Sequence, residues 1–414
     1  MPERGYAVIC LKTTGLFPYQ RDRVVEIAVV HLDEGGRTTA RWQTVVNPGI
    51  NAGDVASHGV STAELLRAPT FEQIAPRLVD LLRGRVLVTH NAQFVTGFLM
   101  REFELIDYAS GGGLEAVCTM HLARRYLPGA GRLLIDCCAA YDIEIGPGPS
   151  ALVQAVACAS LLAAYVHGSP SAAPWIDALD RAERRVLLPI VATGAPAAEW
   201  VERDPVTARS MVPIPSFLAR AAVKLPDYAG PEEHLDYLAL LDLCLVDRVL
   251  SPRESTEVRF LAEFSGIGPE ERIALHRRYF EDLVHVAWLN GALSTSDCAD
   301  VIAVGRMLDV DPEVVAAALT EPSAVTRPAV APVDAMLLEQ GDVVVLTGDM
   351  ARARSDWARE LVARGLALEA AVTLRTRLLV AADPASVTGK TVKARDYGIP
   401  IVSEFGLRSL IGVR

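Results

Sequence analysis

The feature that most constrains the fold of this 414-residue chain is its opening pattern of two apolar runs separated by a turn. Residues 6–11 read YAVICL, and residues 24–32 read VVEIAVVHL. Runs of this length that are rich in Val and Ile predict buried strands. The Thr-Thr-Gly at 13–15 is a turn signal between them. The chain therefore opens with two buried strands joined by a short connection.

The segments that follow continue an α/β order through residue 168. They are VNPG at 46–49, SHGVS at 57–61, APTFEQIAPRLVDLL at 68–82, VLVTHNAQFVTGFLMREF at 86–103, CTMHLARRYLPG at 118–129 and ALVQAVACASLLAAYV at 151–166. The predicted order is strand, strand, strand, helix, strand, helix, helix, which is an α/β arrangement. These motifs and their order resemble the DnaQ-like (DEDDh) 3′–5′ exonucleases. The resemblance implies an RNase H-like domain over residues 1–168.

The same resemblance places the catalytic positions of the family on residues that cannot bind magnesium. The family holds two divalent metals with four carboxylates and uses a general-base histidine. Its five positions fall here on Cys10, Lys12, Val95, Pro149 and Gln154. Because Mg²⁺ prefers hard, anionic oxygen ligands, no two-metal centre is expected with these side chains. We therefore predict a pseudo-exonuclease domain with no catalytic residue, no metal and no cofactor.

The groove that the metals would occupy can still have a role. Cys10 and Lys12 lie two residues apart on a strand, so both face the same side and point into this groove. Our main interpretation is that they fill a disused pocket. One alternative is that Lys12, with Thr13, Thr14 and Asn91, anchors a nucleic-acid phosphate. The enzymatic alternatives are a residual 3′–5′ exonuclease or new chemistry at Cys10, whose thiol gains thiolate character beside the Lys12 ammonium.

The cysteines and the hydropathy pattern bear on the compartment. The seven cysteines are odd in number, and none shows the spacing of a zinc site, so we expect reduced thiols in the core. We expect no apolar run to reach the roughly 18 residues that a membrane-spanning helix needs. We therefore predict a cytoplasmic protein that does not contact a membrane. A net charge of −11 argues against nonspecific coating of nucleic acid.

The middle of the chain is predicted to be helical. Residues 169–230 form a Pro/Ala-rich connecting segment, partly helical, and residues 231–326 contain an internal repeat. Residues 237–256 and 280–299 align as a helix, a turn and a Ser-x-x-acid capping signal. This resembles the TerB-like helical domains. The matching loops suggest a cation site, but they hold few carboxylates, so an interaction or scaffold bundle is the favoured interpretation. Residues 230–328 contain 18 Asp/Glu against 8 Lys/Arg, and we expect this acidic bundle to bind a protein partner.

A linker at 327–340 leads to a last α/β domain at 341–414, which contains 11 Lys/Arg and 8 Asp/Glu. The pattern predicts a strand and turn at 342–350, a helix at 354–368, a strand at 373–383, and a helix, a strand and a helix over 389–411. This order, with Trp357, Gly365 and Gly398, resembles a BRCT domain. The resemblance places phosphate-binding groups on Thr347, Gly348, Arg354 and Lys393. A hydroxyl, a backbone amide and cations at a helix N-terminus suit a phosphate.

These observations together predict a multidomain, non-catalytic adaptor in DNA metabolism. We expect its last domain to recognise a phosphate on a DNA 5′ end or on a phosphorylated protein. The alternative that stays open for this domain is a packing module whose cations are solvated at the surface.

Overall fold

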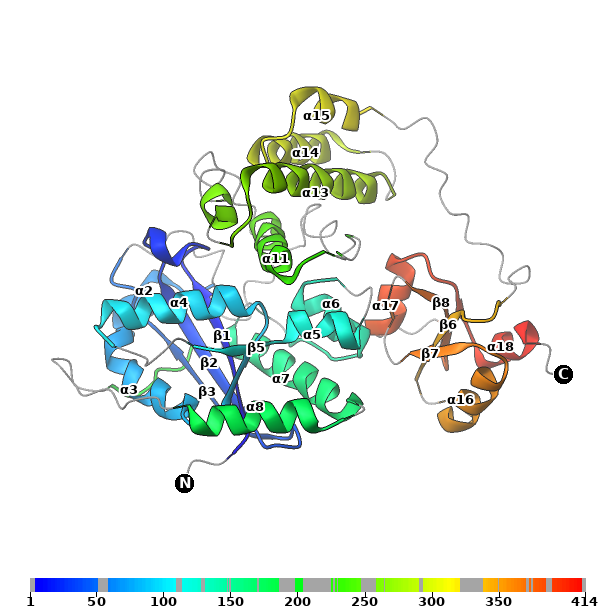
Figure 1. The fold of residues 1–414 in the computed structure, drawn as a ribbon, viewed down its shortest axis with the longest axis horizontal. Helices are drawn as coiled ribbons and strands as arrows, with labels where there is room; N and C mark the ends of the chain where they lie inside the picture. The colour runs from blue at the N-terminus through cyan, green and yellow to red at the C-terminus, as the bar shows by residue number, and fades with distance from the viewer. Residues whose placement is uncertain are drawn as a thin grey trace. The chain divides into compact units, whose positions relative to one another are not determined.

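The computed structural model divides into two compact units, each of which is described by itself. The first comprises Met1–Leu122, Ile145–Ile214 and Leu235–Asp247, and the second comprises Ala123–Glu144, Pro215–His234 and Arg248–Arg414 (Figure 1). The structure describes residues 4–411 except 51–58, 109–113, 128–130, 147, 149, 170, 186–197, 204–224, 226–227, 229, 247–257, 264, 290–292, 321–337, 349, 370–371, 374 and 385–388.

The first unit is built on a five-stranded sheet in the order β3-β2-β1-β4-β5. Its strands are β1 Tyr6–Thr13, β2 Val24–Leu32, β3 Thr38–Val45, β4 Val86–Thr89 and β5 Ala116–Cys118. The first three strands pair antiparallel, whereas β4 and β5 run parallel to β1. The two strands predicted from the opening pattern are confirmed, and β1 extends two residues beyond the predicted end.

Helices cover both faces of this sheet. Helices α3 Phe71–Leu82 and α4 Ala92–Leu105 pack against one face through a hydrophobic cluster that includes Ala7, Ile9 and Leu11 of β1. Helix α7 Ala151–Gly168 packs against β1, β2 and β3, and α8 Ala173–Arg184 contacts β4. The short helices η1 Pro18–Gln20 and α2 Thr62–Arg67 complete the sheet domain.

Helix α7 corrects one expectation about hydropathy. It is long and apolar enough to cross a membrane by length and composition alone, so the expectation that no run reaches this limit was wrong. In the structure this helix contacts three strands of the sheet and buries Ala155, Cys158 and Leu162. An apolar helix of this kind is also what the core of a domain requires.

Helices dominate the middle of the chain. They are α5 Thr119–Tyr126, α6 Leu134–Ala140, α11 Glu232–Val246, α13 Pro269–Leu289, α14 Thr295–Met307 and α15 Pro312–Ala318. The second copy of the repeat is confirmed at its cap, where Ser294 and Asp297 form the predicted capping box at the start of α14. The matching Ser251 and Glu254 of the first copy lie outside the described residues.

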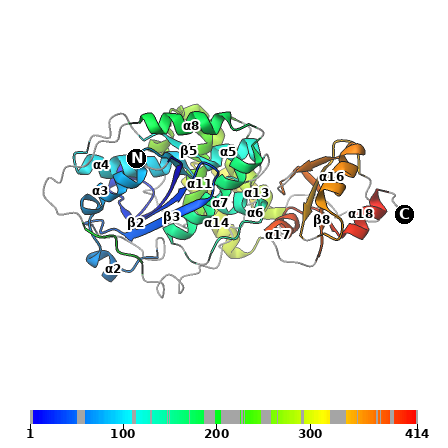
Figure 2. The same ribbon diagram turned by 90° about the horizontal axis from the view of Figure 1, so that it is seen from below.

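The C-terminal residues form a parallel four-stranded sheet in the order β7-β6-β8-β9. Its elements are β6 Val343–Thr347, α16 Arg354–Ala363, β7 Ala367–Glu369, β8 Thr376–Ala381, α17 Gly389–Asp396, β9 Ile401–Val402 and α18 Glu404–Leu410 (Figure 2). All of these were expected except β7, whose residues were assigned to the end of the preceding helix. Gly365 has a φ of +81°, which ends α16 and lets the chain turn into β7.

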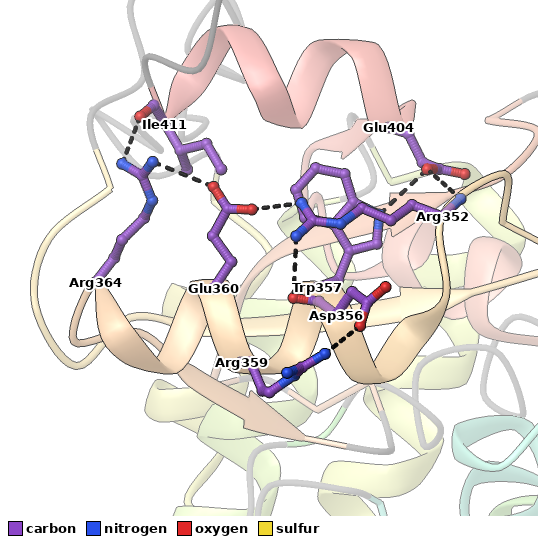
Figure 3. Close-up of polar contacts among 8 residues, drawn as sticks. All are labelled: Arg352, Asp356, Trp357, Arg359, Glu360, Arg364, Glu404 and Ile411. Carbon is purple, nitrogen blue, oxygen red and sulfur yellow. Dashed lines mark hydrogen bonds and ion pairs between the residues drawn. The ribbon is translucent and has the colours of Figure 1, made fainter.

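Trp357 forms the centre of the core on the α16 side of this sheet. Its side chain is fully buried, and its indole N–H donates to Glu404 Oε2 over 3.2 Å. The Arg352 guanidinium lies 4.6 Å from the ring and also pairs with Glu360 (Figure 3). Glu404, the first residue of α18, thus ties the start of that helix to Trp357 of α16.

Candidate functional site

The two predicted family positions on β1, Cys10 and Lys12, lie on the face of the sheet that α7 covers. Ala7, Ile9 and Leu11 belong to the cluster under α3 and α4. Because side chains alternate along a strand, Cys10 and Lys12 lie on the opposite face. Helix α7 contacts β1 there. Cys10 is buried, whereas Lys12 at the end of the strand is partly exposed.

The Cys10 thiol is part of a buried chain of hydrogen bonds. A hydrogen bond from Cys10, more than the opposing effect of burial, lowers the pKa of Cys158 on α7. The Cys158 sulfur lies 3.5 Å from Thr119 Oγ1, which is 3.0 Å from His90 Nδ1. This chain gives Cys10 an internal partner on the helix, away from any open surface.

Beside Lys12, the sheet carries a buried ion pair that the sequence had not suggested. Glu26 pairs with Lys12 in strand register and is fully buried. Arg203 Nη1 lies 3.2 Å from Glu26 Oε2, and the same guanidinium donates to the Gly59 carbonyl. Ser150, the N-cap of α7, donates its hydroxyl to Glu26 Oε1 over 3.1 Å.

The environment of Glu26 favours a sealed ion pair over a metal ligand. Burial raises the pKa of Glu26, and Arg203, the Ala151 amide, Lys12 and Ser150 oppose that rise in this order. The carboxylate therefore already receives two hydrogen bonds from α7 and a guanidinium. Arg203 and Lys12 place two positive charges beside this carboxylate, which disfavours a divalent cation there.

The other three family positions do not supply ligands within the described residues. Val95 is buried and belongs to the hydrophobic cluster with Phe98 and Leu99. Gln154 is partly buried in the first turn of α7. Pro149 lies outside the described residues.

The proposed groove anchors are engaged in local structure. The Thr13 hydroxyl donates to the Gly15 carbonyl over 2.6 Å, and Thr14 Oγ1 lies 3.2 Å from Asp22 Oδ1. Asn91 caps α4 in the left-handed conformation, with its side-chain oxygen accepting from the Phe94 amide. These residues shape the turns at the ends of β1 and β4.

One of the four expected phosphate-binding residues, Thr347, binds a carboxylate of the same unit. Thr347 Oγ1 donates to Asp142 Oδ2 over 3.2 Å. The Lys390 amide, in the first turn of α17, donates to Asp142 Oδ1 over 2.7 Å. The Lys390 ammonium lies 3.2 Å from Asp142 Oδ2. A hydroxyl, an amide and an ammonium thus converge on one anion. Lys390 is not among the residues that the resemblance assigns to this site.

The remaining three predicted residues of this site differ in their roles. Gly348 has a φ of +84°, and a Cβ there would lie 2.9 Å from Ala382 Cβ, so this turn requires glycine. Lys393 is buried and its ammonium donates to the Asp136 carbonyl over 2.8 Å. Arg354 begins α16, and its side chain lies outside the described part.

A third polar group gathers Cys118, His121 and Asp236. His121 Nε2 lies 2.7 Å from Asp236 Oδ1, a partner 115 residues away. Burial raises the pKa of Cys118 to about 11, with the Asp236 carboxylate adding to the rise and the His121, Ala92 and Met120 amides opposing it. The sequence analysis found no zinc-site spacing among the cysteines, and the fold brings Asp236 to Cys118 and His121 from 115 residues away.

Comparisons with known proteins identify the first domain. Residues 11–147 match the family model described as Exonuclease. The chain is 39% identical over 104 residues to a DNA polymerase III subunit epsilon-like protein of Rhodobacter capsulatus, covering 24% of this chain and 15% of the relative. It is 28% identical over 146 residues to DNA polymerase III subunit epsilon of Escherichia coli, covering 33% and 60%.

The matches are partial. A third relative, the 3′–5′ exonuclease DinG of Bacillus subtilis, is 32% identical over 136 residues, which cover 31% of this chain and 14% of DinG. The chain thus spans less than two thirds of the length of these relatives. The nuclease domain of 3′hExo, a DEDDh family member, is 16% identical with a TM-score of 0.37, covering 46% of this chain and 98% of that domain. A TM-score of 0.37 is too low to support a conclusion about this chain.

Proposed function

Since residues 11–147 form an exonuclease-family domain, we propose that this chain uses the exonuclease scaffold as a non-catalytic adaptor in DNA metabolism. The observation that carries the proposal is the buried pair of Glu26 and Arg203 beside Lys12. Two-metal hydrolysis needs several carboxylates to hold two cations, and these cations stabilise the attacking and leaving oxygens. Here the nearby carboxylate is already neutralised by an internal guanidinium.

The proposal assigns ligand recognition to the C-terminal domain, which we take to resemble a BRCT domain. The support is the set of donors on Thr347 and Lys390, which bind the carboxylate of Asp142 in three contacts. A phosphate monoester presents more anionic oxygens than a carboxylate and can use the same donors. We propose that a DNA 5′-phosphate end or a phosphorylated protein binds here in exchange for Asp142.

The acidic helical region supplies the second part of the proposed adaptor. Residues 230–328 carry a net charge of −10, and the described part contains the capped helices α14 and α15. A strongly acidic surface disfavours nucleic acid and favours a basic protein surface. We propose that this region, which resembles a TerB-like bundle, binds a protein partner in the cytoplasm.

The proposed anion site is tested by titrating the full chain with matched ligands. The probes are a labelled DNA duplex and a labelled peptide, each with and without a phosphate. We expect the phosphorylated form of one probe to bind at least tenfold more tightly. Lys390→Ala should weaken that binding by about 2 kcal/mol, roughly thirtyfold, because it removes a charge-assisted contact.

The matched control is Arg395→Ala on the same helix, whose guanidinium donates to the Pro384 carbonyl. It removes the same charge from α17 and should leave the affinity within about threefold, since exposed charges contribute little. Equal affinity for phosphorylated and unphosphorylated probes would contradict the proposed recognition. If both substitutions weaken binding equally, the loss of affinity is a general effect of the charge of α17 and not of a contact made by Lys390.

A further inference from the structure

A cysteine, a histidine and an aspartate meet at one edge of the first unit, away from the five family positions. Cys118 is the last residue of β5, His121 lies in the first turn of α5, and Asp236 lies on α11. One sulfur, one imidazole nitrogen and one carboxylate oxygen lie within 4.8 Å of one another. The strand-to-helix connection turns Cys118 and His121 to the same side, and α11 brings the third group.

This spacing suits a single metal ion. Zinc binds sulfur at about 2.3 Å and imidazole or carboxylate at about 2.0–2.2 Å, which places tetrahedral ligands about 3.5 Å apart. The three ligand atoms are within 4.8 Å, so adjustments on the order of 1 Å bring them to that geometry. The hydrogen bond of 2.7 Å between His121 and Asp236 would open to admit the ion.

The surroundings of the sulfur supply a second, independent observation. The Ala92 backbone amide donates to Cys118 Sγ over 3.4 Å. A neutral thiol is a weak acceptor, so this donor forms a stronger hydrogen bond with a thiolate. A metal-bound thiolate is stabilised by such donors, which commonly surround metal ligands.

We propose that Cys118, His121 and Asp236 bind a Zn²⁺ ion, with water or another ligand in the fourth position. The ligand chemistry selects this ion: thiolate and imidazole suit zinc, whereas Mg²⁺ and Ca²⁺ require oxygen ligands. Binding releases the Cys118 proton, because the thiolate is the ligand. The ion ties α11 to β5 and α5 across 115 residues of sequence. The site is distinct from the two-metal centre of the exonuclease family.

The test uses the full chain, stripped with a chelator and titrated with Co²⁺ under reducing conditions. We expect one equivalent of Co²⁺ to give a thiolate-to-cobalt charge-transfer band and the strong visible bands of four-coordinate cobalt. One equivalent of Zn²⁺ should abolish both. Cys118→Ser should lose the charge-transfer band, and His121→Gln and Asp236→Asn should each weaken binding by at least about tenfold.

The matched control is Cys298→Ser, which removes a partly exposed thiol of α14 and should leave the spectrum unchanged. Circular dichroism checks that each variant is folded. If Cys118→Ser does not fold, the partly exposed His121 provides the deciding variant. A charge-transfer band that survives Cys118→Ser, or Co²⁺ affinity that is unchanged by His121→Gln, would overturn the proposal. Binding below one equivalent that depends on Cys298 would assign the ion to a surface thiol.

Discussion

The two charged sites of this molecule differ in whether their anion can leave. In the exonuclease-family domain, the Glu26 carboxylate and its partner Arg203 are 0% and 2% exposed. In the second unit, the side chain of Asp142, which precedes the C-terminal domain in the chain, is 30% exposed, although its partner Lys390 on α17 is 8% exposed. A sealed pair of charges is part of a core, whereas a partly exposed carboxylate can exchange with another anion. A set of paired polar groups can therefore bind an external ligand only where its internal anion is accessible and can be displaced.

The largest expected effect tests the sealed side of the comparison. Arg203→Ala leaves the Glu26 carboxylate buried without its guanidinium. We expect a loss of about 3–5 kcal/mol in the free energy of unfolding, because an uncompensated buried charge is strongly destabilising. This loss is measured by denaturant titration of the full chain, from the unfolding transition of the exonuclease-family domain.

Two further variants separate a sealed ion pair from a general effect of charge. The double variant Glu26→Gln, Arg203→Met removes both charges and should recover a large part of the lost stability. Arg37→Ala breaks the exposed pair of Arg37 and Asp33 and should cause no measurable change. If Arg203→Ala changes stability by less than about 1 kcal/mol, the pair is not part of the core as described.

A smaller effect distinguishes the two domains by pH. His31 on β2 is buried, and burial, with the charges of Arg85 and Arg77, lowers its pKa to about 4 against the hydrogen bond to the Leu81 carbonyl. The unfolded chain therefore binds a proton near pH 6.5 that the folded chain binds only near pH 4. Stability from this group is present above pH 6.5 and is lost as the pH falls toward 4, by at most about 1.4 kcal/mol per pH unit.

The C-terminal domain is the internal reference for this pH effect, because the sequence contains no histidine after His285. Acid titration between pH 6.5 and 4 should therefore weaken the exonuclease-family domain first. His31→Gln should flatten that dependence. An unchanged slope in this variant would show that His31 is protonated in the folded state.

The smallest expected effect tests the exchangeable side. Asp142→Asn removes the internal anion from Thr347 and Lys390 while keeping a residue that tolerates the left-handed φ of 58°. We expect affinity for the phosphorylated probe to rise about tenfold, or about 1.4 kcal/mol, because the ligand no longer competes with a carboxylate. Glu144→Ala, an exposed carboxylate nearby, is the control. Unchanged or weaker binding in Asp142→Asn would contradict exchange.

The elements could be predicted from the sequence where the signal is local. The apolar runs gave β1 and β2, and the Ser294–Asp297 capping box gave the start of α14. Strand β7 was missed because its three residues, Ala367–Glu369, are too few to show an alternating pattern. The glycine before it, Gly365, carried the only local signal that the helix ends.

Motifs in the chain could assign the five family positions, but not the partners of the residues there. The structure places two of them, Cys10 and Lys12, on one face of β1 as alternation requires. Arg203 could not be found in this way, because it reaches Glu26 across 177 residues without a motif. Asp142 joins Thr347 across 205 residues for the same reason. Such pairs depend on tertiary packing, which no local pattern encodes.

The most direct measurement of the central claim is a nuclease assay on the purified full chain. Single-stranded DNA labelled at its 5′ end is incubated with the protein and Mg²⁺ or Mn²⁺, and the products are separated by length. Because the part of the chain that the structure describes brings no group of three or more carboxylates together near Lys12, Val95 and the Glu26–Arg203 pair, we predict no shortening beyond that in buffer. A ladder of products shortened from the 3′ end, abolished by chelator and coeluting with the chain, would contradict the account.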